Sequence, residues 1–224
     1  MRNFLGDAFF GGACFVCRGK ASGLLCAACR AELPLLAPEL CPRCALPSPG
    51  GAHCGRCLAE PPGYDATIAA LAYDFPADTL VHALKFRGEL ALAPLLGGLL
   101  HDRLPPDDSV DCVVPVPLSA GRLRSRGYNQ ALEIARHVAP AKVDIELCVR
   151  QRDGAPQMEL PWAERQRNVR GAFDCRRALL GARIAVVDDV MTTGATLDEM
   201  ARTLKRAGAE RVVNWVVART LPPV

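Results

Sequence analysis

Eight of the eleven cysteines lie before residue 58, and they form four CxxC pairs. A CxxC turn supplies two thiolate ligands, and two such turns complete a tetrahedral four-cysteine zinc site. The loops between the pairs are rich in glycine, proline and small residues, so metal binding must supply folding free energy that a core of this size cannot. We therefore predict structural zinc. The predicted ligands are Cys14, Cys17, Cys26, Cys29, Cys41, Cys44, Cys54 and Cys57.

Disulfide bonds and redox-active CxxC motifs are the competing interpretations. Disulfides are rare in the cytoplasm, and we expect a cytoplasmic chain without membrane insertion, because no apolar run reaches about 18–20 residues and the N-terminus lacks a signal-peptide core. Four CxxC pairs exceed what one thiol-exchange site requires. Eight thiolates can bind one or two zinc ions. The short gaps favour two sequential sites, and an interleaved arrangement stays open.

Beyond the cysteines, strand-like and helix-like segments alternate. Near-continuous apolar strands separated by helices predict an α/β fold with a parallel sheet covered on both faces. The chain has 224 residues, enough for one ordinary domain and a small module. We predict a double zinc-ribbon module over residues 1–62 and the parallel-sheet domain over residues 63–224. The predicted strands are 67–73, 111–117, 142–149, 182–189 and 210–218. The predicted helices are 77–86, 90–104, 129–139 and 195–208.

The stretch IAVVDDVMTTGATLDEM, residues 184–200, combines an apolar strand, two acids and a threonine-rich turn. In doubly wound sheets, ligands bind beyond the carboxyl ends of the strands. Carboxylates there can accept hydrogen bonds from vicinal hydroxyls, as on a ribose, and the N–H groups at a helix start suit a phosphate. The pattern therefore predicts a site for a ribose 5-phosphate. An ordinary turn with capping threonines is the alternative.

Basic residues gather in the middle of the sequence. The formal net charge of +3 is too small to indicate a nucleic-acid binder, but Arg122, Arg124 and Arg126 fall within a few residues of one another. Such a basic zone suits phosphates on a small molecule or on a nucleic acid, and a solvated arginine-rich loop is the alternative. In LKFRG, residues 84–88, the aromatic Phe86 is flanked by charges. It fits either base stacking with single-stranded nucleic acid or the core.

The residues IAVVDDVMTTGAT also resemble, without departure, the motif by which type I phosphoribosyltransferases bind 5-phosphoribosyl 1-pyrophosphate (PRPP). The resemblance implies that Asp188 and Asp189 contact the ribose hydroxyls and that the following loop binds the 5-phosphate. Mg²⁺ is expected to accompany PRPP, because pyrophosphate carries several negative charges. The loop residues are Thr192, Thr193, Gly194, Ala195 and Thr196.

Over essentially the whole chain, the order of motifs resembles the ComF family, which joins a double zinc ribbon to a phosphoribosyltransferase-like domain. The motifs are the CxxC pairs, LKFRG, PVPLSAGRLRSRGYNQA and QMELPWAERQRNVRGAF. The resemblance implies a type I phosphoribosyltransferase-like fold and a pyrophosphate loop after the second strand, followed by a lid over residues 150–170. A plain surface loop is the alternative to the lid. The residues expected to bind pyrophosphate are Leu118, Ser119, Arg122, Arg124 and Arg126. Those expected in the lid are Arg150, Arg152 and Gln157.

The same resemblance implies a function in natural competence. Members of the family are associated with uptake of single-stranded DNA into the bacterial cytoplasm, so single-stranded DNA and DNA-translocation proteins are expected partners. The alternative is an active phosphoribosyltransferase on a nucleobase-like acceptor, outside DNA uptake. A regulator that binds PRPP without DNA is a third hypothesis. The acid pair favours a sugar ligand in each case, because carboxylates repel the phosphates of DNA. No motif identifies an acceptor pocket or a catalytic residue.

Overall fold

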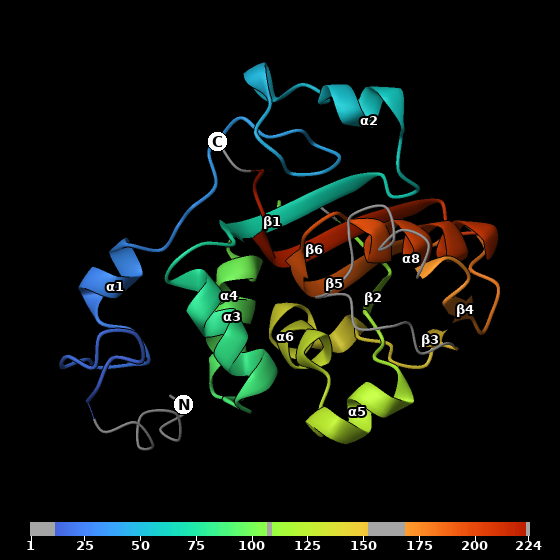
Figure 1. Ribbon diagram of the computed structural model, residues 1–224. Helices are drawn as coiled ribbons and strands as arrows, with labels where there is room; N and C mark the ends of the chain where they lie inside the picture. Colours follow the sequence, from blue (N-terminus) through green and yellow to red (C-terminus); the bar gives the residue numbers. More distant parts are fainter. Residues whose placement is uncertain (1–11, 107–108, 152–168, 223–224) are drawn as a thin grey trace.

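The computed structural model describes residues 12–106, 109–151 and 169–222 (Figure 1). Within these ranges, no helix is both long and apolar enough to span a membrane. The helices are α1 (Ala27–Ala31), α2 (Gly55–Ala59), α3 (Ala77–Phe86), α4 (Leu92–His101), α5 (Ala120–Arg126), α6 (Gln130–Val138) and α8 (Ala195–Arg206), with 3-10 turns η1 (Pro49–Gly51) and η2 (Pro140–Lys142). The strands are β1 (Ala66–Ala72), β2 (Cys112–Pro115), β3 (Cys148–Arg150), β4 (Phe173–Cys175), β5 (Arg183–Met191) and β6 (Arg211–Arg219).

The central sheet consists of four parallel strands in the order β1-β6-β5-β2. Helices connect the strands, because parallel neighbours need a crossover rather than a tight turn. All four strands point the same way, so their carboxyl ends lie at one edge of the sheet. The predicted parallel α/β fold is confirmed.

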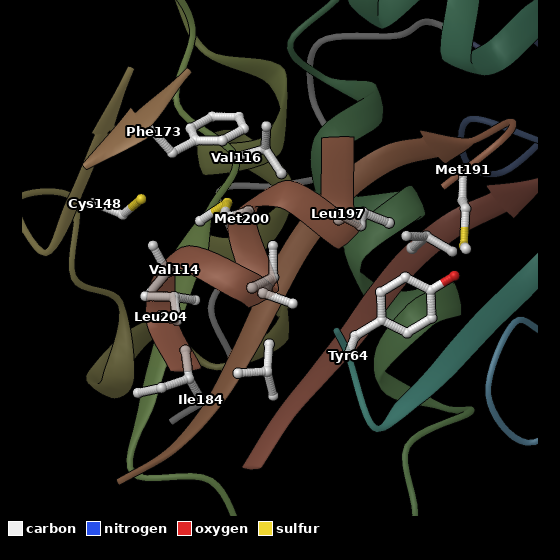
Figure 2. Close-up of a cluster of buried hydrophobic side chains, with 14 of the residues drawn as sticks. Tyr64, Val114, Val116, Cys148, Phe173, Ile184, Met191, Leu197, Met200 and Leu204 are labelled. Carbon is white, nitrogen blue, oxygen red and sulfur yellow. The ribbon is translucent and has the colours of Figure 1, made fainter. Parts of the chain in front are cut away.

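Helices cover both faces of this sheet (Figure 1). Side chains alternate between the faces along each strand. Ile184 and Val186 pack in the same cluster as α8, whereas Ala185 and Val187 pack with α3, α4 and α6. Figure 2 shows the first of these clusters, in which Leu197, Met200 and Leu204 of α8 lie against the sheet. Apolar side chains on both faces explain why the strands read as continuous apolar runs.

Strand β5 is longer at its carboxyl end than predicted. Its ladder with β6 continues to Met191, which is aligned with Arg219, and the carbonyl of Met191 accepts from the N–H of Thr220 at 3.0 Å. Asp188 and Asp189 therefore lie before the end of the strand instead of at its last two positions. Because the side chains alternate, these two acids start from opposite faces of the sheet.

The strand predicted over residues 142–149 is mostly wrong. A 3-10 turn ends at the first residue of this segment, and only the segment's last two residues belong to β3, which pairs antiparallel with β4 in a separate two-stranded sheet. The side chain of Asp144 accepts hydrogen bonds from the N–H groups of Glu146 and Leu147, both at 2.9 Å. Such a turn competes with a strand for the backbone donors, and apolar alternation does not reveal it.

The cysteines form two separate four-cysteine clusters in sequential order. Within each cluster, one ligand atom per residue lies within 4.8 Å of the others. Sulfur atoms from different pairs approach to 3.7 Å between Cys17 and Cys26, and to 3.6 Å between Cys44 and Cys54. Four thiolates at this spacing fit a tetrahedral zinc ion with no open position for water. The first cluster is Cys14, Cys17, Cys26 and Cys29, and the second is Cys41, Cys44, Cys54 and Cys57.

The zinc-ribbon segment packs against the sheet. The N–H groups of Thr67 and Ala72 in β1 donate to the carbonyls of Pro42 and Pro34, at 3.1 and 2.7 Å respectively. These bonds cover the free edge of β1, which would otherwise present unpaired backbone groups. Figure 1 shows the second ribbon beside β1 and the first ribbon beside α3. The division at residue 62 stays a prediction, and hydrogen bonds cross it.

We expect two zinc ions per chain. Cys17→Ser and Cys54→Ser each remove one ligand from one cluster, so each variant is expected to retain one tightly bound ion. Elemental analysis of the purified proteins measures the zinc content. Cys112→Ser is the matched control, because Cys112 lies outside both clusters, and it should keep two ions. A single zinc in the unmodified protein would contradict the two-site arrangement.

Candidate functional site

A lysine from α3 forms an ion pair with one of the two acids of β5. The Nζ of Lys85 lies 2.8 Å from Oδ2 of Asp189, whose side chain is 2% exposed. Asp188 is half-buried, and its Oδ1 accepts from the N–H of Asp189 at 2.9 Å. The sequence suggested basic residues in this segment but not that Lys85 would pair with an acid.

The two acids have opposite protonation tendencies. Burial raises the pKa of Asp188 well above its usual range, and the charge of Asp189 raises it further. Burial also acts to raise the pKa of Asp189, but the ammonium group of Lys85 outweighs it and holds that pKa below its usual range. The pair therefore favours one proton, held on Asp188, and one carboxylate, paired with Lys85.

Cationic and aromatic groups surround this pair. Arg126 hydrogen-bonds Oε1 of Gln130 on α6, and its guanidinium lies 5.4 Å from the ring centroid of Phe86. Phe86 is 49% exposed, so it belongs to the surface rather than to the core. Its ring also lies 6.0 Å from Nζ of Lys85. The site therefore combines an acid pair, of which Asp189 is buried and Asp188 half-buried, with a basic, aromatic rim.

The turn between β5 and α8 has the conformation that the motif requires. Gly194 adopts φ 84° as the N-cap of α8. A Cβ at this position would lie 2.7 Å from Cε of Met191 and 3.0 Å from Oη of Tyr64, so only glycine fits. Gly194 supplies no side chain to cap the helix, and the hydroxyl of Thr193 accepts from the N–H of Ala195 at 3.2 Å. The positive end of α8 thus faces a turn rich in small and hydroxyl residues.

The segment after β2 is more helical than a simple phosphate loop. Ser119 is buried and caps α5, with its hydroxyl accepting from the N–H of Arg122 at 3.4 Å. Leu118 and Arg122 are half-buried and Arg124 is exposed. Of the three predicted arginines, Arg126 is the one whose side-chain contacts in the described part of the chain join it to the acid-pair surroundings.

Two further residues of these motifs have defined contacts, Asn129 before α6 and Arg150 in β3. Asn129 caps α6, accepting from Ala131 at 3.0 Å, and donates to the carbonyl of Val116, also at 3.0 Å. Of the predicted lid residues, Arg150 lies in β3 with its guanidinium 5.4 Å from the ring centroid of Phe173. The other two, Arg152 and Gln157, lie outside the described residues.

Sequence reasoning missed a buried arginine behind the turn that follows β5. Arg219 is 1% exposed at the end of β6. Its guanidinium donates to the carbonyls of Cys44, Met191 and Thr220, each at 2.8 Å, and to that of Thr192. A single arginine ending the apolar run VVNWVVAR was the available signal, since a charge there must find partners when buried.

Comparison with known proteins agrees with this arrangement. A family model described as a double zinc ribbon domain matches residues 5–58, and one described as a phosphoribosyl transferase domain matches residues 123–220. DNA utilization protein YhgH of Salmonella typhimurium strain LT2 is 36% identical over 227 residues, covering 94% of this chain and 98% of that protein. Competence protein F of Haemophilus influenzae is 29% identical over 228 residues, with the same coverage. Competence protein ComFC of Streptococcus pneumoniae is 24% identical over 197 residues, covering 87% of each.

The fold, the two four-cysteine clusters and the family models define a phosphoribosyltransferase-like protein that carries a double zinc ribbon. The similarity to YhgH and the competence proteins extends over nearly the full length of both partners. The chain belongs to the ComF family.

Asp188→Asn is expected to stabilise the ligand-free protein increasingly as pH rises. The folded pKa of Asp188 is raised, so above the unfolded value of about 3.9 the unmodified protein loses stability until pH passes the folded pKa. The amide does not ionise, and its N–H can donate where the bound proton now lies. Thermal unfolding between about pH 4.5 and 8 measures the difference, at about 2–4 °C for each kcal/mol.

The exposed acid Asp174 in β4 provides the matched control for this change. Asp174→Asn should shift the melting temperature little across the same range. A melting-temperature difference for Asp188→Asn that stays constant with pH would contradict the raised pKa.

Proposed function

We propose that the carboxyl edge of the sheet binds PRPP with Mg²⁺. The observation that carries this proposal is one continuous unit, in which the acid pair of β5 is followed, after two residues, by a glycine-containing turn and the start of α8. A ribose 5-phosphate presents a diol and a phosphate within one small molecule, and these two parts of the unit complement them. An isolated phosphate would not need the acids.

In this proposal, the turn from Thr192 to Thr196 binds the 5-phosphate through N–H groups and hydroxyls, helped by the dipole of α8. Asp188 is the more accessible acid and receives the first ribose hydroxyl. Asp189 becomes available when Lys85 moves, since the half-buried ammonium sits on a flexible stem. Lys85 then carries a positive charge that can face the pyrophosphate.

Pyrophosphate needs further cations. Arg126 already lies at the acid pair's rim, and we assign it, with Arg122, Arg124 and the backbone of Leu118 and Ser119, to this group. Mg²⁺ suits carboxylate and phosphate oxygens, and it would lower the repulsion between the acid pair and the ligand. A covering role for the segment that contains Arg150, Arg152 and Gln157 completes the site.

The names of the relatives connect this PRPP site with DNA. One relative is called a DNA utilization protein and others are called competence proteins. We propose that this chain functions in cytoplasmic handling of single-stranded DNA during uptake, together with proteins that translocate DNA. The exposed ring of Phe86 and the neighbouring Arg126 supply the stacking and charge that single strands bind.

Turnover of PRPP is the alternative function. The acid pair favours a sugar ligand over simple DNA binding, because carboxylates repel phosphates, and this holds for a transferase and for a protein that only binds PRPP. Transfer to a nucleobase-like acceptor would release pyrophosphate, so release of pyrophosphate on adding a nucleobase distinguishes a transferase from a protein that only binds PRPP.

Addition of Mg-PRPP is expected to raise the melting temperature of the protein, because a ligand that binds only the folded state stabilises it. Asp189→Asn should abolish the shift, since it removes the carboxylate that accepts from the ribose. Asp174→Asn, which changes an exposed acid in β4 to which no ligand contact is assigned, should keep it. Absence of a shift in the unmodified protein would remove the PRPP proposal.

Affinity for single-stranded DNA is expected to fall steeply with salt. Arg126→Ala should reduce the slope of log affinity against log salt by about 0.7, as expected for loss of one phosphate contact. Phe86→Ala should weaken binding by about 1–3 kcal/mol for each base that stacks on the ring.

Fluorescence anisotropy with a labelled oligonucleotide gives both quantities. Arg103→Ala is the matched control, because Arg103 is exposed beside Thr67 at the start of β1 and therefore near the opposite edge of the sheet. An affinity independent of salt would contradict a phosphate-binding rim.

A further inference from the structure

The second zinc ribbon and the phosphate loop share a buried arginine. Nε of Arg219 donates to the carbonyl of Cys44, a zinc-ligand residue, while Nη1 of the same side chain donates to Met191 and Thr192. One planar guanidinium thus fixes the ribbon backbone relative to the loop backbone. We propose that Arg219 is a positioning residue through which zinc at the second four-cysteine cluster and phosphate at the Thr192–Thr196 turn stabilise each other. This inference rests on the proposed function.

The peptide geometry explains how such a contact would favour phosphate. In a trans peptide unit the C=O and the next N–H point in opposite directions. The carbonyls of Met191 and Thr192 bind Arg219, and that of Thr193 accepts from Nη2 of Arg56 at 3.3 Å. The N–H groups of the next residues, up to Gly194, are therefore directed away from the ribbon. Successive N–H groups of this kind form an anion-binding concavity.

These N–H groups are free for such a ligand. Within the described ranges, the backbone N–H groups of Thr193 and Gly194 form no hydrogen bond to the protein. Backbone donors are almost always satisfied when they are buried, and Gly194 is buried. The unpartnered donors and the arginine-bound carbonyls lie on the same three peptide units, which is the arrangement expected if the ribbon orients the loop for an anion.

Side-chain packing adds to the connection. Oη of Tyr64, in the segment between α2 and β1, lies 3.0 Å from the position where Gly194 would carry a Cβ. Figure 2 shows Tyr64 beside Met191 at the end of β5. The N–H of Gly63 donates to Oδ1 of Asp198 in the first turn of α8, at 2.5 Å. The chain leaving the second ribbon therefore contacts both the loop and the helix that follows it.

The charges are also complementary. Four thiolates around Zn²⁺ leave a net negative charge on the second cluster, and Arg219 lies against it with no acid partner in the described part of the chain. An uncompensated buried cation is costly. The zinc–thiolate group therefore compensates the same cation that orders the loop.

The first ribbon provides a control within the same molecule. Cys14, Leu25 and Leu33 of that ribbon pack in the cluster that contains α3 and α4. Among the described residues, none of its hydrogen bonds reaches the turn after β5. Loss of zinc from the first cluster should therefore leave the loop in place.

The first experiment compares Cys54→Ser with Cys17→Ser by calorimetric titration with Mg-PRPP. Disruption of the second cluster is expected to weaken binding about tenfold or more, within the 5–150-fold range common for coupled sites. Disruption of the first should change it by less than about twofold. Equal affinities for the two variants, with binding intact in the unmodified protein, would overturn the coupling but not the proposed function.

The second experiment uses the unmodified protein and so does not depend on whether Cys54→Ser folds. Linkage is reciprocal, so saturating Mg-PRPP should raise the zinc affinity of one of the two clusters by the same factor. Equilibrium competition with a chelator measures this affinity. Arg219→Met should bind zinc and PRPP with no coupling between them, a readout that simple destabilisation does not produce. No effect of PRPP on either zinc ion would overturn the inference, and absence of PRPP binding would overturn the proposed function itself.

Discussion

Thiolate coordination is the constraint on which the arrangement of this protein depends. The loops between the CxxC pairs are rich in glycine, proline and small residues, so the two four-cysteine clusters must fix these loops. Once fixed, the second ribbon directs its backbone carbonyls outward. The carbonyls of Pro34 and Pro42 accept hydrogen bonds from N–H groups of β1, and the carbonyl of Cys44 accepts one from Arg219. The ribbon therefore packs against the edge strand of the sheet and forms part of the same structure, rather than being a separate appended module.

The candidate site combines two kinds of buried charge with different consequences. Asp189 is neutralised by Lys85, a partner on a flexible side chain that a ligand can displace. Arg219 is surrounded by backbone carbonyls that cannot leave. The first pair suits a group that must become accessible, and the second suits a group that must stay in place. This difference explains why we propose that the acids contact a ligand and that Arg219 holds the backbone in position.

Much of the fold was predictable because apolar periodicity and short motifs are local. Helix α3 has the predicted bounds, and β1, α6 and β6 differ from the prediction by one residue at each end. The failure at residues 142–149 arose from the side chain of Asp144, which bonds the backbone nearby. The pairing of the acids with Lys85 was not predictable, since about a hundred residues separate them in the sequence.

The sequence by itself determined the cysteine pairs, the parallel α/β order and the acid–threonine unit, because each depends on neighbours within about a dozen residues. The tertiary structure decided which cysteines cluster, that Asp189 meets Lys85, and that Arg219 joins the second ribbon to the turn after β5. These are contacts between segments brought together by sheet order and packing. A buried charge selects its partner from whatever the completed fold places beside it, and no local pattern records that choice.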